Sequence, residues 1–204
     1  PGPARRSRRL ARCAAPRGRR PTCRAPATCV SRRRRSLVAS AAPEFELYRL
    51  RPAVLADVAE VTAIEQASFP VPWRREFFES ELRELHPPRY NRVLERQLPG
   101  MPRLAAYLFA VILFDEFHVN KIATHPAVRG EGHGRRLMRD AIDAARDRRA
   151  ASIVLEVRLS NAEAIRFYRA FAFVEVGRRK RYYKDGEDAR VMMLPLLEEP
   201  FLRG

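Results

Sequence analysis

The sequence predicts an α/β fold, in which helices cover a mixed β-sheet. From residue 44 to residue 197, apolar residues recur alternately at strand spacing and at helix spacing, and the segments follow the order βααβββαβαββ. The chain has 204 residues and is 46% hydrophobic, enough for one domain with a buried core. We therefore expect one domain over residues 44–197, with a tail before it (1–43) and a short C-terminal tail after it (198–204).

The first half of this domain begins with a strand and two helices. Alternation starting at Glu44 indicates a strand that closes at Arg51-Pro52, and Asp57 can then help to begin a helix. A proline-broken stretch, 69–73, separates this helix from a second one, which ends at His86-Pro87-Pro88. Val58, Val61, Ile64 and Glu65 recur along the first helix, and the second helix should bury a face that carries Phe77, Phe78, Leu82 and Leu85.

A β-meander should follow, with strands at 90–95, 104–114 and 117–123 and a turn at 99–102. The apolar run Leu104–Phe114 has eleven residues, fewer than the ~20 that a membrane helix needs. It therefore indicates a buried strand, and we expect no membrane association.

The second half should contain two helices and three strands. A loop over 127–134 precedes a helix that carries Leu137, Met138, Ala141, Ile142 and Ala145 at helical spacing. After a strand at 152–158, the capping-box spacing of Ser160 and Glu163 predicts a helix over 161–170. The last strands, 173–176 and 190–196, flank a tyrosine-rich turn.

The charge of +16 is concentrated in the first 43 residues, which hold 13 Arg and no acidic residue. The rest carries 27 basic against 24 acidic residues, a net of +3, which does not by itself indicate nucleic-acid binding. The tail is poor in large apolar residues and is predicted to be disordered. It could be an RNA-binding arm, an organellar transit peptide or spurious upstream translation; 37 Arg against three Lys suggests a GC-rich genome and favours the last.

Cysteine and histidine spacings predict no metal site. Cys13, Cys23 and Cys29 all lie in the tail, at spacings that match neither a zinc motif nor a disulfide framework. The domain therefore has no cysteine nucleophile. His118, His125 and His133 have no metal-ligand spacing and should be solvated or bonded within loops.

A glycine-rich loop offers a site for a phosphate. Gly130, Gly132 and Gly134 fall between a strand and a helix, and glycines let backbone N–H groups at a helix start approach an anion closely. The loop lacks the Lys-Ser/Thr ending of a P-loop, and it follows the fourth or fifth strand, which disfavours a dinucleotide fingerprint. A flexible connecting loop is the alternative.

Arg129, Gly132 and Gly134 match the pyrophosphate loop of the GNAT superfamily of N-acetyltransferases, which the chain resembles over most of residues 45–196. The resemblance implies a GNAT-like acyl-CoA N-acyltransferase fold and direct transfer of acetyl from acetyl-CoA to the N-terminal alanine of a small-subunit ribosomal protein. Further motifs that carry it are Arg51-Pro52-Ala53, Phe69-Pro70 with Pro72-Trp73, Leu155-Glu156-Val157-Arg158, Ser160-Asn161, Tyr168 and Tyr182-Tyr183.

Glu156 is the candidate general base. It interrupts an apolar strand, where a charge is costly unless it is partnered or faces a cleft. A carboxylate can take a proton, directly or through water, from an α-ammonium group, whose pKa is near 8. The resemblance implies this role; the alternative is a structural salt bridge to Arg158, on the same face of the strand.

The resemblance implies the remaining site residues. Tyr168 would protonate the departing CoA thiolate, although it could instead be core packing. Trp73, Tyr182 and Tyr183 would frame the peptide groove, or pack on one another. The predicted cofactor-binding residues are Ile122, Ala123 and Thr124 along pantetheine, Arg129, Gly130, Glu131, Gly132, His133 and Gly134 at the pyrophosphate, and Asn161.

One position departs from the pattern of the superfamily. Ala172 stands where a glycine usually follows the helix of Tyr168. The left-handed backbone conformation at this position costs a residue other than glycine about 1 kcal/mol or more. We therefore expect this helix to end differently, which would shift Tyr168.

Two other functions are open at this stage. The chain could be a GNAT acetyltransferase for a small amine or a lysine side chain, or a ribosome- or RNA-binding protein that uses its basic tail. We expect a monomer in the cytoplasm, or in a plastid or mitochondrion if the tail is a transit peptide.

Overall fold

A computed structural model describes residues 47–84, 88–97 and 102–196. The predicted tails, the three cysteines, Leu85, His86-Pro87 and most of the turn at 99–102 lie outside these residues. The predicted order of elements, βααβββαβαββ, is confirmed. No helix in the described ranges is long and apolar enough to cross a membrane.

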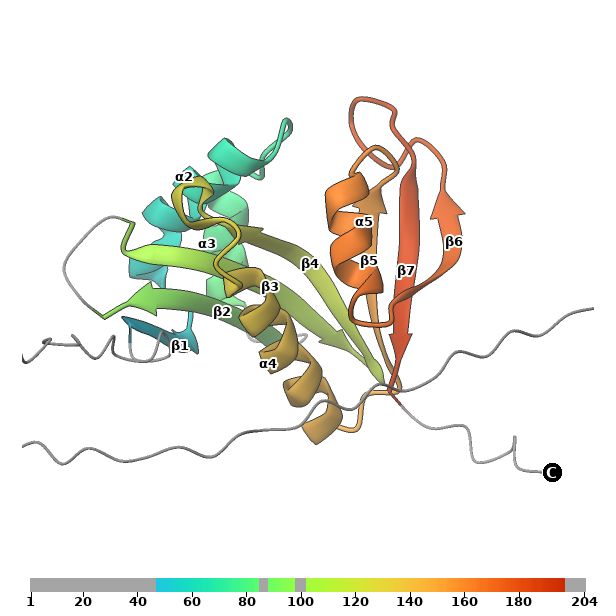
Figure 1. The fold of residues 1–204 in the computed structure, drawn as a ribbon, viewed down its shortest axis with the longest axis horizontal. Helices are drawn as coiled ribbons and strands as arrows, with labels where there is room; N and C mark the ends of the chain where they lie inside the picture. The colour runs from blue at the N-terminus through green and yellow to red at the C-terminus, as the bar shows by residue number, and fades with distance from the viewer. Residues whose placement is uncertain (1–46, 85–87, 98–101, 197–204) are drawn as a thin grey trace, which may run out of the picture. The chain divides into compact units, whose positions relative to one another are not determined.

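Seven strands form one mixed sheet in the order β1-β2-β3-β4-β5-β7-β6 (Figure 1). All neighbours are antiparallel except β4 and β5, which are parallel. The strands are β1 Tyr48–Pro52, β2 Arg89–Arg96, β3 Leu104–Leu113, β4 Glu116–Thr124, β5 Ser152–Arg158, β6 Val174–Arg179 and β7 Ala189–Pro195. Strands β2, β3 and β4 make the predicted β-meander.

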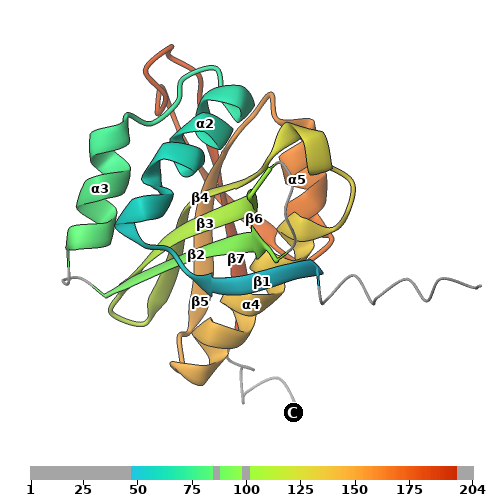
Figure 2. The same cartoon turned by 90° about the vertical axis from the view of Figure 1, so that its left-hand side faces the viewer.

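In the described part of the chain, helices cover both faces of the sheet, as Figure 2 shows. Helices α2 and α3 pack on one face through a core that includes Phe78, Tyr107 and Phe109. Helices α4 and α5 pack on the other face, over Leu108, Leu155 and Met192 among others. The helices are α2 Val58–Ser68, α3 Arg75–Arg83, α4 His133–Asp147 and α5 Ala162–Arg169, with 3₁₀ turns η1 Leu55–Asp57 and η2 Pro126–Val128.

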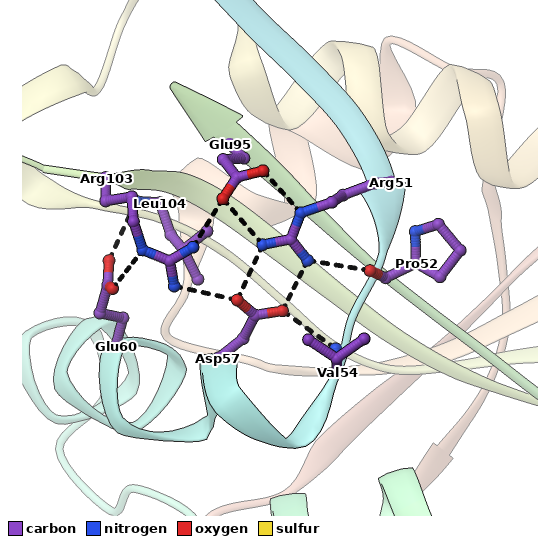
Figure 3. Close-up of polar contacts among 8 residues, drawn as sticks. All are labelled: Arg51, Pro52, Val54, Asp57, Glu60, Glu95, Arg103 and Leu104. Atoms are coloured by element: carbon purple, nitrogen blue, oxygen red, sulfur yellow. Dashed lines mark hydrogen bonds and ion pairs between the residues drawn. The ribbon is translucent and has the colours of Figure 1, made fainter. Parts of the chain in front are cut away.

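The start of α2 is held to the sheet by a cluster of charged side chains (Figure 3). The Asp57 carboxylate, almost fully buried, accepts hydrogen bonds from Arg51 at 2.7 and 2.8 Å, from Arg103 at 2.9 Å and from the Val54 backbone N–H at 2.9 Å. Glu95 bridges the same two arginines at 2.7 and 2.6 Å. Because Arg51 lies in β1, Glu95 in β2, Asp57 in η1 and Arg103 directly before β3, the cluster joins the edge of the sheet to α2.

Burial alone would raise the pKa of Asp57, but the hydrogen bonds from Arg51, Val54 and Arg103 outweigh it and lower the pKa to about 2. The folded pKa lies below the unfolded value of about 3.9, so the carboxylate stabilises the fold above about pH 4 and loses this effect as pH falls towards 2. We expect Asp57→Asn to lower the free energy of unfolding by about 2–3 kcal/mol at pH 7. Urea unfolding should show this difference shrinking between about pH 4 and pH 2.

Asp143→Asn makes the same chemical change on the exposed surface of α4, where Asp143 forms a long ion pair of 3.9 Å with Arg146. It should leave stability nearly unchanged. An Asp57→Asn difference that persists undiminished at pH 2 would show that its origin is not the carboxylate charge.

Three local expectations are wrong. The side chain of Phe77 is 54% exposed, so its predicted burial is wrong; α3 does bury Phe78, as predicted, and partly covers Leu82. Helix α5 is capped by Asn161, whose Oδ1 accepts from the Ala164 N–H at 3.0 Å; no capping box on Ser160 starts it. Ala172 adopts the left-handed conformation itself, with φ 66°, so α5 ends as it would with glycine and Tyr168 is not shifted for that reason.

Candidate functional site

The site forms where β4 and β5 separate. Their parallel pairing covers only Glu116–Val119 and Ser152–Leu155, and beyond it the two strands diverge (Figure 1). The β3–β4 register also shifts at this point, because Asn120 is an extra residue between Val119 and Lys121. Such a bulge bends a strand, which here opens the sheet directly before Glu156 on β5.

A cavity of 610 Å³ occupies this opening. Of the predicted site residues, its wall contains both catalytic candidates, two cofactor candidates and all three peptide candidates: Glu156, Tyr168, Ile122, Asn161, Trp73, Tyr182 and Tyr183. The wall also includes residues that were not predicted to belong to the site, among them Phe69, Phe77, Lys121 and Arg158.

The cavity connects the two faces of the sheet. Leu155 and Val157 belong to the core beneath α4 and α5, so Glu156, between them on β5, faces the side of α2 and α3. Lys121 of β4 faces the same side, since it stands opposite Phe109 of the α2–α3 core. Tyr168 of α5 enters from the other side. Groups that approach from opposite faces can therefore meet between β4 and β5.

Glu156 is held at the edge of the cavity with its side chain 13% exposed. Its Oε1 lies 3.1 Å from Arg179 of β6, whose own side chain is 54% exposed. The alternative of a salt bridge to Arg158 is wrong, because the Arg158 guanidinium pairs with Asp185 and Glu187, each at 2.7 Å. Within the described residues, Glu156 thus pairs with a surface arginine and keeps a place in the cavity wall.

Tyr168 is almost completely buried and packs against Phe167 and Phe173, with ring centroids at 5.3 and 5.7 Å. Burial raises the pKa of its hydroxyl well above the usual value, and nearby Tyr183 adds to the increase. Tyr168 therefore belongs both to the core and to the cavity wall, and its hydroxyl stays protonated.

Trp73, from the loop between α2 and α3, and the two tyrosines, from the loop between β6 and β7, line the cavity wall. Tyr182 and Tyr183 pack on each other at 5.1 Å, while Trp73 lies against Phe77 and Phe78 at 6.1 and 5.6 Å. The Arg158 guanidinium lies 3.9 Å from the Tyr183 ring centroid and holds the hairpin over β5. The expected alternative of mutual packing thus holds for the tyrosines but not for Trp73.

The glycine-rich loop lies outside the cavity wall, at the start of α4. Gly132 caps this helix with φ 86°, and Gly130 has φ 85°. A Cβ at either glycine would meet nothing within 4 Å, so the space beside the loop is open to a ligand. The first N–H groups of a 15-residue helix face this space, and their partial positive charge favours an anion.

Neighbouring residues brace the loop. Arg129 donates to the Ser68 hydroxyl at 3.0 Å and to the Thr124 carbonyl at 3.4 Å, which ties it to α2 and the end of β4. His133 is buried against Tyr48 and lies 3.0 Å from Glu131, which agrees with bonding within the loop. The edge of β4 over Ile122–Thr124, including Ala123, faces the opening where β5 has left it. A long ligand with an anionic group could extend from this loop along β4 into the cavity.

Among the described residues, no group of three or more His, Cys, Asp or Glu side chains could hold a metal ion. His118 lies 3.4 Å from Glu116, and His125 accepts a hydrogen bond from the Ala127 N–H at 3.1 Å. Both histidine side chains therefore interact with residues close to them in the sequence.

Comparison with known proteins agrees with this geometry. The profile of the acetyltransferase (GNAT) family matches residues 58–173. The [ribosomal protein bS18]-alanine N-acetyltransferase of Escherichia coli K12 is 36% identical over 143 residues, which cover 69% of this chain and 92% of the relative. An N-alpha-acetyltransferase of Sulfolobus acidocaldarius is 34% identical over 157 residues, 73% of this chain and 93% of the relative.

The crystal structure of the ribosomal-protein-S18-alanine N-acetyltransferase from Escherichia coli superimposes with a TM-score of 0.65 at 31% identity. The match covers 78% of this chain and all of that chain.

Proposed function

The chain belongs to the GNAT acetyltransferase family and is an acetyl-CoA-dependent N-acetyltransferase, and we propose that its acceptor is the N-terminal alanine of a small-subunit ribosomal protein. The observation that carries this proposal is the cavity between β4 and β5, which joins the acidic Glu156 on one face of the sheet to Tyr168 on the other. The names of the relatives supply the nature of the acceptor.

The residues present fit acetyl-CoA. The open space beside Gly130 and Gly132, braced by Arg129, suits its pyrophosphate, together with Glu131, His133 and Gly134. The free edge of β4 at Ile122, Ala123 and Thr124 can bond the amides of its pantetheine arm. Asn161 uses Oδ1 for the helix cap, which leaves its side-chain N–H groups for the same ligand.

Glu156 removes a proton from the α-ammonium group, directly or through water, because its carboxylate lines the cavity on the acceptor face. Acetyl-CoA supplies the thioester carbon that the neutral amine attacks. Tyr168 donates its hydroxyl proton to the departing sulfur from the other side of the opening. The amine acquires the acetyl group directly, and no residue of the chain carries it.

Trp73, with Tyr182 and Tyr183, supplies aromatic walls for an extended N-terminal segment. Tyr182 is 47% exposed, so it is accessible to a peptide that enters from the α2–α3 side. We propose in addition that the enzyme acts as a monomer in the cytoplasm.

The test is mass-spectrometric acetyl transfer by the full chain, from acetyl-CoA to a short peptide that begins with the alanine of the ribosomal protein. A second peptide with a blocked N-terminus and one internal lysine serves as the control. We expect acetylation at the alanine amine and little at the lysine. Preferred modification of the lysine, or acetyl-CoA binding without any transfer to the alanine peptide, would contradict the proposed acceptor.

A further inference from the structure

Lys121 is a buried cation in the wall of the acceptor cavity. It follows the bulge at Asn120 on β4, and its side chain is only 15% exposed. Its Nζ lies 2.8 Å from Glu65 Oε1, 4.1 Å from the centroid of the Phe69 ring and 5.3 Å from that of Trp73. These contacts fix the ammonium group in place.

Glu65 is the anchor of this arrangement. It is fully buried in α2 and accepts hydrogen bonds from the Trp73 backbone N–H at 2.8 Å and from the Tyr107 hydroxyl, besides its contact with Lys121. Its oxygens are thus occupied within the protein, and its carboxylate is not exposed to a ligand. The only charged group that this buried pair presents to the cavity is the ammonium of Lys121.

The ammonium group of Lys121 has N–H donors available for a ligand. It carries three N–H groups, and within the described part of the chain its one acceptor is Glu65. Burial lowers the pKa of Lys121, an effect that Glu65 opposes and Arg158 strengthens, so the cation is poorly compensated there. A ligand that brings an oxygen acceptor would relieve this cost. Arg158, by contrast, already has two carboxylate partners.

We propose that Lys121 is a positioning residue, which donates a hydrogen bond to the first carbonyl oxygen of the acceptor peptide and so favours α-amines over lysine side chains. This inference rests on the proposed N-terminal acetylation. Lys121 and Glu156 face the same side of the sheet, from the two strands that border the opening. In an N-terminal residue the amine and the carbonyl oxygen are borne on adjacent carbons, so one can reach Glu156 while the other reaches Lys121. A lysine ε-amine is borne on methylenes and offers no such oxygen.

The test compares two enzymes with two substrates. Lys121→Met keeps a long apolar side chain without charge or donors, and it is assayed in the full chain beside the wild type. One substrate is the alanine peptide; the other replaces its first peptide bond by a trans-alkene, which keeps the shape and removes the carbonyl oxygen. We expect Lys121→Met to lower kcat/KM by about 10- to 100-fold for the peptide and by less than about threefold for the alkene analogue.

Equal losses on both substrates would assign Lys121 a structural role and overturn the proposal, as would no loss on either. Because Lys121→Met leaves Glu65 buried without its cation, the double variant Glu65→Gln, Lys121→Met provides a neutral pair that should show the same selectivity. If the wild type acetylates the peptide and its alkene analogue equally well, the inference fails while the proposed function stands. If it acetylates no alanine peptide, the proposed function fails and this inference with it.

Discussion

Glu156→Gln is expected to lower kcat for acetylation of the alanine peptide by about 10²- to 10⁴-fold, the usual effect of removing a general base. The side chain lines the cavity on the acceptor face, where an incoming ammonium group must lose a proton before it can attack. Glutamine has the same shape but cannot take that proton at neutral pH. The measurement is steady-state acetyl transfer, with acetyl-CoA binding by calorimetry to confirm that the donor site is intact.

The matched control is Arg179→Gln, which removes the 3.1 Å ion pair and leaves the carboxylate. Because Arg179 is more than half exposed, this pair should contribute little to the fold, and the variant should keep kcat within about fivefold of the wild type. If Arg179→Gln loses as much activity as Glu156→Gln, activity depends on the ion pair between Arg179 and Glu156, and Glu156 is not the base.

The order of elements could be predicted because each carries its own periodicity. Leu104–Leu113 is apolar on both faces since both faces of β3 are covered, and α4 presents one apolar stripe because only one side of it meets the sheet. The residues at which the elements end were harder to predict from the sequence. Strand β6 continues to Arg179, past an irregular pairing between Glu175 and Gly177, through a basic run that gives no strand signal.

Which polar side chains meet in the cavity could be anticipated only where a motif existed. Glu156 stands out in an apolar strand, whereas Lys121 is an ordinary charge in a strand until the bulge and α2 enclose it. The helical pattern of α2 does not show whether Glu65 is buried or exposed. Its partners on β3 and β4, Tyr107 and Lys121, are distant in sequence. At Ala172 a local rule gave the wrong prediction. The left-handed conformation costs a non-glycine residue about 1 kcal/mol, yet Ala172 adopts it and the helix ends there as it would with glycine.

Tyr168→Phe is expected to lower kcat by about 10²-fold with little change in the KM for acetyl-CoA. The tyrosine ring packs between Phe167 and Phe173, so phenylalanine keeps these contacts and removes only the hydroxyl. Burial raises the pKa of that hydroxyl, which keeps its proton available for the sulfur as the thiolate departs. Release of CoA, followed with a thiol reagent, measures the effect, and an unchanged melting temperature would show that the core is intact.

Tyr183 is the rival proton donor, and Tyr183→Phe is therefore the matched variant. Its hydroxyl is also near the cavity, and burial, opposed by Arg158, raises its pKa to about 12. Tyr183 packs on Tyr182, one of the residues proposed to contact the peptide, whereas Tyr168 belongs to α5 and to the core on the other face of the sheet. Tyr183→Phe should accordingly raise the KM for the peptide and spare kcat. The reverse pattern, with kcat lost in Tyr183→Phe and kept in Tyr168→Phe, would move the acid to the hairpin.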